Sequence, residues 1–532
     1  MQFRSLLPAV FALTLVAASG GVAAPVVLPG WPVAAPSGSV DEGPGGGPVV
    51  TGEVLVGGPE YPDVAAVAYR RNGTRRWMTT VGSCIECGGF RGAPRQADGT
   101  YGPFLLLPSF PYPSPAIDRN GVIVSGCTGT VQSDGTCTSV RPVVDESGVS
   151  RSPGEWRLSS SRGATTLWTY TELAGTFDVN SSSAIYGVPN VVADGTGTVY
   201  STYGYTLDAT DHSVRSRVLA LDAATGTRRW LRSGNFRVLA GLTRGVVVAD
   251  GLDVAALRQD TGLELWRTPG LELGSGQVVV DTAHDRVYVT PRGSHSYSQG
   301  VGQVVVLDAT TGAELWRTPG SDFTELLSID GQGRPLVAVF HKKRYSLRAL
   351  GVNGEPVWQF DTATRVVGAH DLSDGTVAVS LAARQRYFER SEPYSSPGPP
   401  YYFCCGGGEG LLARIDPART AARVRRARVG LRGNVVRVRC DQRHCDLPGR
   451  SAILTMALPT PANVRVSVVA PRTLRPTKYD FPFTVSAPAG LSFVRILTRP
   501  SWAQKKTGRY RVKVEWHDRN GAHTSLFPVR FV

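Results

Sequence analysis

The sequence has few of the motifs that mark common enzyme classes. Its 532 residues contain no H-E-x-x-H, G-x-S-x-G or P-loop pattern, and its 8 histidines are scattered along the chain. These absences argue against zinc peptidases, α/β-hydrolases and P-loop nucleotide-binding proteins. Beyond residue 23 no apolar run is long enough to cross a bilayer, so we expect no membrane span.

The first 23 residues have the pattern of a signal peptide. A single basic residue, Arg4, precedes the apolar run Leu6–Ala18, and small residues follow it. We place the cleavage after Ala23, because Pro25 would hinder a cut immediately before it. No cysteine follows the leader closely, which argues against a lipid anchor. We therefore expect a secreted protein or one of the extracytoplasmic cell envelope, with a flexible N-terminal segment over residues 24–50.

Acidic residues are scarce in the last part of the chain. From Pro417 to the end there are 23 Lys and Arg against 5 Asp and Glu, a charge of +18, so a chain of net charge +14 carries −4 before that point. Such a segment attracts polyanions, with binding that weakens as salt rises. Outside a cell the polyanion would be an acidic glycan or a phosphate-rich wall polymer; no nucleic-acid-binding module is evident. The alternative is a solvated basic surface with no dedicated partner.

Three stretches of the chain are nearly the same. Ala220–Trp230, Ala256–Trp266 and Val306–Trp316 each contain an apolar run, a Thr-Gly turn and a second run that ends in tryptophan. Each copy predicts two strands joined by a tight turn, and one such hairpin has too little apolar surface to be stable alone. The sequence is therefore an array of packed repeats.

Weaker copies extend the array on both sides. Their turns and tryptophans are Asn72–Gly73 with Trp77, Gly163 with Trp168, and Asn353–Gly354 with Trp358. Because another strand pair precedes most copies, each unit is predicted to have four antiparallel strands. Seven units can be counted, beginning near residues 53, 115, 190, 241, 276, 326 and 366. An eighth could lie in the 91 residues between Trp77 and Trp168, where Val143–Gly148 is similar to a worn copy.

Each position of the repeat has a physical role. Glycine supplies the positive φ of the turn, and the Asp and Thr before it can hydrogen-bond the turn backbone. A tryptophan on each outer strand can fill the gap between wedge-shaped units, so we expect it to dock one unit on the next. An aromatic ligand site is the alternative, although regularly repeated residues usually serve the repeat's own packing. The docking candidates are Trp77, Trp168, Trp230, Trp266, Trp316 and Trp358.

The repeat resembles that of the pyrroloquinoline quinone (PQQ) β-propellers. This resemblance implies an all-β fold, with a propeller of seven or eight blades over residues 51–420. The family contains both quinone dehydrogenases and scaffolds that bind no cofactor. In the dehydrogenases the quinone lies over the central channel with a calcium ion and, in some, beside a ring made by two adjacent cysteines.

Cys404–Cys405 is the one feature here that matches the dehydrogenases, and it lies in the last blade, away from the family's cysteine ring. Calcium would need about six to eight oxygen ligands, and no carboxylate cluster stands out as such a cage. We therefore assign no catalytic residue, cofactor or metal. Our interpretation is a non-catalytic binding scaffold of the cell envelope. The alternative is a PQQ- and calcium-dependent oxidoreductase acting on an alcohol or sugar.

Strand direction places the long connections on one side of the propeller. Connections alternate between the two ends of an antiparallel blade, so the Thr-Gly turns share one face and nearly all insertions lie on the opposite face. Long loops are uncommon unless they have a function, so the loop-rich face is our candidate binding face for an envelope protein or glycan. Its candidate aromatic residues are Phe90, Tyr101, Phe104, Tyr394, Tyr401, Tyr402 and Phe403. The alternative is a local cover over blade edges.

The 8 cysteines fall into four pairs that are close in sequence: Cys84 and Cys87, Cys127 and Cys137, Cys404 and Cys405, Cys440 and Cys445. An oxidising compartment favours disulfides, so we interpret them as structural staples. Gly88 stands where the haem motif C-x-x-C-H needs histidine. A zinc site from the first and third pairs is conceivable, although secretion disfavours it. Cross-pairing of those two pairs would instead tie the first blade to the last, and the connectivity stays open.

Residues 421–532 alternate apolar and polar side chains, as in Val464–Val468 and Arg509–Trp516. This period of two predicts strands with one wet face. With Asp518–Gly521 as a hairpin turn, the segment resembles an immunoglobulin-like β-sandwich. We expect this small basic domain to make any contact with an anionic wall polymer.

Overall fold

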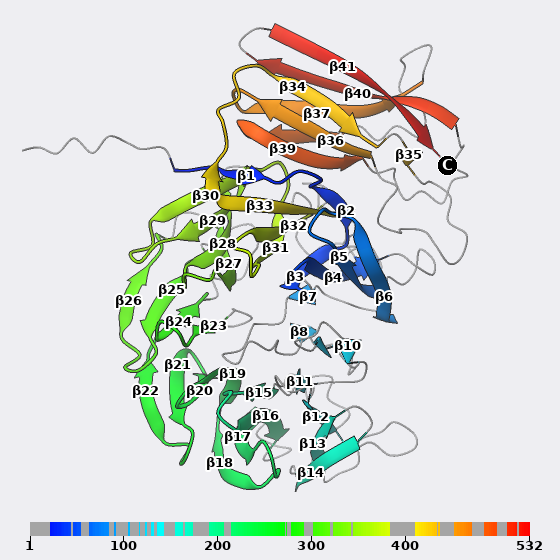
Figure 1. Ribbon diagram of the computed structural model, residues 1–532. Coiled ribbons are helices and arrows are strands. Elements are labelled where there is room, and N and C mark those ends of the chain that lie inside the picture. Colours follow the sequence, from blue (N-terminus) through cyan, green and yellow to red (C-terminus); the bar gives the residue numbers. More distant parts are fainter. Residues whose placement is uncertain are drawn as a thin grey trace, which may run out of the picture.

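The computed structural model consists of β-strands and connections throughout the part of the chain that it describes (Figure 1). The described residues are 22–43, 46–54, 63–83, 90–91, 105–106, 116–117, 123–124, 129–131, 136–142, 155–162, 165–173, 191–206, 214–271, 273, 278–291, 302–319, 323–341, 344–382, 410–433, 435–436, 452–470, 483–496, 508–518 and 521–531. In these ranges no helix combines the length and the hydropathy that a membrane crossing requires.

Antiparallel sheets arranged as blades make up most of the molecule (Figure 1). The four-stranded blades are β3–β6 (Ser37–Glu42, Pro48–Val54, Asp63–Tyr69, Arg75–Ser83), β11–β14 (Gly129–Val131, Thr136–Pro142, Glu155–Arg162, Thr165–Leu173), β15–β18 (Val191–Ala193, Thr198–Thr206, Val214–Asp222, Arg228–Gly234), β19–β22 (Phe236–Leu242, Gly245–Asp250, Asp253–Arg258, Glu264–Thr268), β23–β26 (Val278–Asp281, Arg286–Val289, Val305–Asp308, Glu314–Arg317) and β27–β30 (Phe323–Ile329, Pro335–His341, Arg344–Leu350, Pro356–Thr362). A further blade contains β31 (Val366–Asp371), β32 (Val377–Ala382) and β33 (Gly410–Thr420). The all-β propeller fold is confirmed.

The unit predicted to begin near residue 115 has a different composition. The hairpin at that position forms β9 (Ala116–Ile117) and β10 (Ile123–Val124), which are a separate two-stranded sheet. The strand that carries Trp168, β14, belongs instead to the sheet that begins with β11. Another short pair, β7 (Phe90–Arg91) and β8 (Leu105–Leu106), lies between them and the first blade in the sequence. The chain between Trp77 and Trp168 therefore contributes to several sheets.

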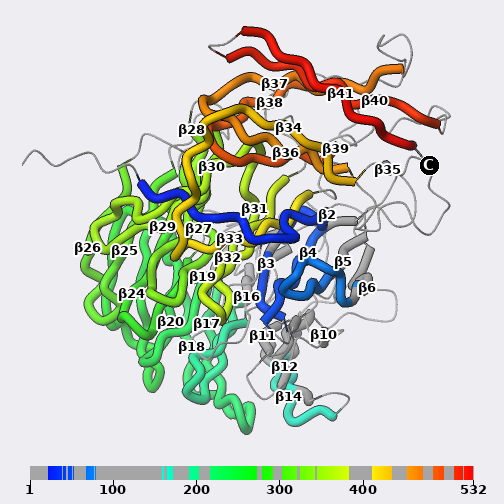
Figure 2. The backbone as a smooth tube through the Cα atoms, turned by 45° about the horizontal axis from the view of Figure 1, so that its top comes forward, coloured from blue at the N-terminus to red at the C-terminus, as the bar shows by residue number. Residues whose placement is uncertain are grey.

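Residues 24–50, predicted to be flexible, form strands instead. β1 (Pro25–Val27) and β2 (Val33–Ala35) both pair with β33, so the N-terminal segment supplies the outer strand of the last blade. In Figure 2 the dark blue N-terminal tube, which contains β1, runs beside β33. The first blade then begins at Ser37 rather than near residue 53. The prediction was wrong because β1 and β2 are short, and the strand with which they pair, β33, lies almost at the other end of the propeller sequence.

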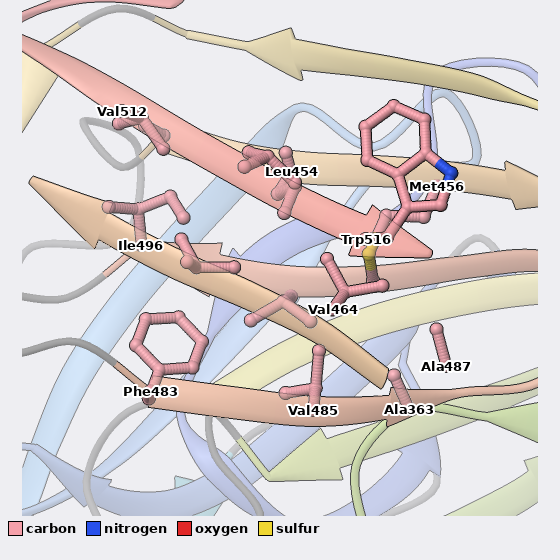
Figure 3. Close-up of a cluster of buried hydrophobic side chains, with 14 of the residues drawn as sticks. Ala363, Leu454, Met456, Val464, Phe483, Val485, Ala487, Ile496, Val512 and Trp516 are labelled. Atoms are coloured by element: carbon pink, nitrogen blue, oxygen red, sulfur yellow. The ribbon is translucent and has the colours of Figure 1, made fainter. Parts of the chain in front are cut away.

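The C-terminal residues form a sandwich of two sheets. One contains β34 (Arg428–Arg432), β36 (Ala452–Leu458) and β39 (Gly490–Ile496); the other contains β35 (Val435–Val436), β41 (Gly521–Phe531), β40 (Gly508–Asp518), β37 (Ala462–Val469) and β38 (Phe483–Ala487). Leu454 and Met456 from the first sheet pack against Val464, Val512 and Trp516 from the second (Figure 3). The chain thus has a second core, and the immunoglobulin-like class of this sandwich stays a prediction.

The three-stranded sheet is buried on both faces. Leu454 points into the sandwich core, whereas Ile453 and Phe493 pack in a cluster with residues of the last two blades. Strand β39 contacts β30 and β33, and the Nη1 of Arg495 lies 3.5 Å from the Gly410 carbonyl oxygen, to which it donates. The order of layers is therefore propeller, three-stranded sheet, five-stranded sheet (Figure 1).

Candidate functional site

The repeated tryptophans lie between adjacent blades. The Trp230 ring packs on Gly262, in the Thr-Gly turn of the next blade, and its Nε1 donates to the Gln259 carbonyl at 2.8 Å. A Cβ on Gly262 would lie 2.7 Å from Cδ2 of the ring. Trp266 packs in the same way on Gly312. The turn glycine is thus needed both for its positive φ, +68° at Gly262, and for the room that the indole occupies.

Two more docking candidates also pack on the turn glycine of the next blade. Trp168 packs on Gly226, and its Nε1 donates to the Ala223 carbonyl at 2.8 Å. The Trp316 ring lies against Gly354, where a Cβ would lie 3.0 Å from Cε3. Each contact joins the outer strand of one blade to the turn of the blade that follows. Together these contacts hold consecutive blades against one another around the ring.

The ends of the series differ. Trp358 lies in β30, on the blade before the last. At the next joint the N-terminal segment takes the place of a hairpin turn, and its Ala23 forms a β-bridge with Trp358. Backbone bonding continues there, because the N–H of Gln359 donates to the Ala23 carbonyl at 2.9 Å. Trp77 is in β6, and its side chain lies outside the described residues.

Trp31 is the docking residue at the joint between the last blade and the first. It lies between β1 and β2, is 5% exposed, and its ring centroid lies 6.2 Å from that of Tyr69. Its Nε1 donates to the Arg71 carbonyl at 3.1 Å, beside the Gly73 turn. The sequence reasoning missed Trp31 because no repeat surrounds it. The Gly73 turn could have indicated a further docking residue, because none of the predicted tryptophans was assigned to pack on it.

A buried arginine also joins the two blades. Arg414, on β33, is 4% exposed and forms an ion pair with Asp374. It donates from Nε to Thr376 Oγ1 at 2.8 Å and from Nη1 to the Arg71 carbonyl at 3.0 Å. Burial acts to raise the pKa of Asp374, but hydrogen bonds from Thr376 and Arg414 outweigh it and hold that pKa below its usual value. These charges are satisfied within the joint, which indicates a structural role.

Carboxylates connect blades around the face that carries the Thr-Gly turns. Both oxygens of Glu42 accept from the Ser373 N–H, at 3.0 Å, and Asp371 Oδ2 accepts from the Gly331 N–H at 2.7 Å. Burial raises the pKa of Asp371 to about 6; the Gly331 bond opposes this rise, and the charge of Asp330 adds to it. These bonds run from blade to blade, so they reinforce the ring.

The sandwich docks beside β30 and β33, and some of its contacts lie at the opposite, loop-rich face. Strands β16, β24, β28 and β32 end on this face, and β17, β25, β29 and β33 begin there. Ala363, in the connection from β30 to β31, packs in the sandwich core. Arg495 bonds to Gly410, at the start of β33. The sandwich therefore borders the candidate binding face beside the blade joint.

Most of the predicted disulfide and aromatic residues lie outside the described residues. Cys137 and Phe90 are placed as strand backbone only, opposite Val131 and Leu106 respectively. The others outside the described ranges are Cys84, Cys87, Cys127, Cys404, Cys405, Cys440, Cys445, Tyr101, Phe104, Tyr394, Tyr401, Tyr402 and Phe403.

Within the described ranges, no group of three or more His, Cys, Asp and Glu side chains is arranged to hold a metal ion. The carboxylates of Glu42 and Asp371 already accept backbone N–H groups. They do not supply the about six to eight oxygens of a calcium site. These described carboxylates are therefore part of the blade-to-blade bonding.

A PQQ-repeat family model, described as outer membrane protein assembly factor BamB, matches residues 250–386. No protein of curated function matches the sequence. Among solved structures, the chain is similar to BamB from Moraxella catarrhalis, with 12% identity over 74% of this chain and 98% of that one, and a TM-score of 0.31. It is also similar to the quinohemoprotein alcohol dehydrogenase from Comamonas testosteroni, with 13% identity, 76% and 77% coverage and a TM-score of 0.39.

The matched residues contain the clearest copies of the docking contact. They include Trp266 on Gly312 and Trp316 on Gly354, each linking one blade to the next. The repeat, the blade geometry and the family match agree over the same stretch. The propeller of this chain is therefore a PQQ-like β-propeller, and its residues 250–386 match that repeat family.

Proposed function

We propose that the protein is a secreted, non-catalytic scaffold of the cell envelope that binds a protein or glycan partner through its loop-rich face. Support comes from the family match, whose description names an outer-membrane assembly factor, and from the leader pattern at residues 1–23. Propellers of this kind are a rigid platform for long connections, because function commonly sits on loops held by a stable frame.

The observation that carries the proposal is the position of the sandwich. It docks through Ile453, Phe493 and Arg495 on the last two blades, and Arg495 bonds to Gly410 at the loop-rich end of β33. A partner that binds the loop-rich face meets a composite surface, made of propeller connections on one side and the sandwich on the other. The Thr-Gly face offers short turns instead, bonded to one another from blade to blade.

Site-specific photo-crosslinking in cells that export the protein tests this proposal. Arg344 and Val352 lie at opposite ends of β29, both exposed, the first on the loop-rich face and the second in the turn of the opposite face. A photoreactive residue at position 344 is expected to give a discrete adduct with an envelope component. The matched probe at position 352 is expected to give none.

Each alternative outcome has a defined meaning. Adducts at 352 but not at 344 would move the binding surface to the turn face. Absence of adducts at both positions, and at Ala382 beside the joint, would contradict a binding role for the propeller. Retention of the protein inside the cell would contradict the envelope location.

A further inference from the structure

The five-stranded sheet of the sandwich turns one face away from the propeller. The pairing register places Val464, Val514 and Trp516 on its inner face, in the core that it shares with the three-stranded sheet. Because side chains alternate along a strand, the residues between them point outward. Figure 1 shows β40 and β41 on the side of the sandwich that is farthest from the propeller. This outward face is therefore separate from the loop-rich face.

The outward face is strongly basic. Arg509, Arg511 and Lys513 follow one another at every second position of β40, about 6.8 Å apart. Arg530 lies directly opposite Arg509, and Arg465 of β37 lies on the same face. All four arginines are exposed. Like charges placed opposite each other destabilise a sheet, so this arrangement has a cost that an anionic ligand would remove.

Acidic side chains are scarce among the described residues of this outward face. Among its described residues, Glu515 is the one acidic side chain, and it pairs with Lys513 at 2.6 Å. Within the described part of the chain, no carboxylate lies in ion-pair distance of Arg465, Arg509, Arg511 or Arg530. Glu515 lies directly opposite Arg465 in the register, so Arg509, Arg511 and Arg530 are the guanidinium groups with no described acidic residue opposite them.

We propose that this face, made of Arg465, Arg509, Arg511, Lys513 and Arg530, binds an extended polysaccharide that carries carboxylate groups. The planar guanidinium donates two parallel hydrogen bonds to a carboxylate. Exposed Thr484 and Thr524 on the same face provide hydroxyls that can bond to sugar hydroxyls. Among the described residues of this face there is no tryptophan, tyrosine or phenylalanine on which nucleic-acid bases could stack. This surface is additional to the proposed propeller interface and does not depend on it.

The test is calorimetric titration of the full chain with polygalacturonate at low and moderate salt. The triple variant R509S/R511S/R530S is expected to lose affinity on the order of tenfold, because about 1.4 kcal/mol of contact energy corresponds to that factor. The control R70S/R76S/R244S removes the same charge from exposed propeller positions outside the loop-rich face and is expected to change affinity less than about twofold. E515Q removes the acidic residue of the face and is expected to strengthen binding.

Four outcomes would overturn the proposal. Equal losses in the two triple variants would show attraction by net charge alone. Tighter binding of polyphosphate or duplex DNA than of polygalacturonate would identify a phosphate polymer as the partner. Binding only to phosphatidylglycerol vesicles would identify a membrane surface. Absence of saturable heat with polygalacturonate at low salt would remove the glycan site, while leaving the crosslinking result at position 344 unaffected.

Discussion

The indole of Trp31 donates to the carbonyl of Arg71, so a residue near the start of the chain holds the first blade to the last. The contact has the same form as the one between Trp230 and Gln259 inside the ring. The difference is that Trp31 reaches its blade through strand pairing with β33 rather than through a continuous hairpin. Ring closure therefore uses the same indole-to-carbonyl contact as Trp168, Trp230 and Trp266, supplied by a distant segment.

Replacing Trp31 should open this joint. Trp31→Ala is expected to lower the free energy of unfolding by about 3–5 kcal/mol, because a large buried ring is lost. Trp31→Phe keeps most of the packing but loses the Nε1 hydrogen bond, so a loss of about 1 kcal/mol is expected. Denaturant unfolding with hydrogen exchange in β1, β2 and β3 measures both. Equal stability of Trp31→Ala and the wild type would refute the closing role.

Glycine in the docking turns should be required for space as well as for φ. Gly262 and Gly270 have nearly the same φ, +68° and +71°, but only Gly262 has an indole in the position of a Cβ. Gly270→Ala is expected to cost about 1 kcal/mol from backbone strain alone. Gly262→Ala is expected to cost about 1–3 kcal/mol more, because the Trp230 ring must move. Thermal unfolding of the two variants compares them directly, and similar midpoints would contradict the docking model.

Arg414 should be far more important than an exposed arginine. Arg414→Met removes the buried partner of Asp374 and leaves it the exposed Arg71 at 3.8 Å, so a loss of about 3 kcal/mol is expected. The control is Arg258→Met, which breaks an exposed pair with Asp260 and is expected to cost no more than about 1 kcal/mol. Chemical denaturation gives both values. A small effect of Arg414→Met would show that the charges at the joint are dispensable.

Asp371 should make stability depend on pH. Burial raises its pKa to about 6, above the value of about 3.9 expected in the unfolded chain. The folded state therefore binds this proton more tightly, and stability falls as pH rises from about 4 to about 6 and stays lower above that. Asp371→Asn cannot ionise and still accepts the Gly331 N–H bond. After discounting for partial exposure, it is expected to be more stable by about 1 kcal/mol at pH 8.

At pH 4 the Asp371→Asn variant and the wild type should unfold at nearly the same temperature, because Asp371 is then protonated in the folded state. The measurement is the difference between their unfolding midpoints at pH 4 and at pH 8. A difference that is the same at both pH values would show that ionisation of Asp371 does not affect stability.

Local sequence patterns were sufficient for the parts of the fold made by neighbouring residues. The Thr-Gly turns were predictable because their chemistry is local: Asp308, for example, accepts the N–H groups of Thr310 and Thr311. Repetition of that turn indicated an array of packed units, and the resemblance to the PQQ repeat implied the propeller. The apolar alternation of the last domain likewise indicated strands, and these strands form the two sheets of the sandwich.

The predictions that failed depended on distant pairing. β1 and β2 have their partner in β33, so nothing close to them in the sequence indicates strand. Trp31 was missed for the same reason. The basic character of the last domain was visible in its composition. The presentation of Arg509 and Arg530 on a single outward face required the register of β40 with β41.

The pairing of Pro25 with Thr420 has a consequence for the order in which the protein folds. A ribosome makes β1 and β2 first, yet their partner strand is completed only after every other blade has been synthesised. Closing so long a loop is slow and entropically costly compared with forming a hairpin. Individual blades can form as they emerge, but the ring stays open until β33 has left the ribosome. The N-terminal segment thus pairs with β33 late in folding. Closure of the ring is therefore the last step by which the propeller acquires its native stability.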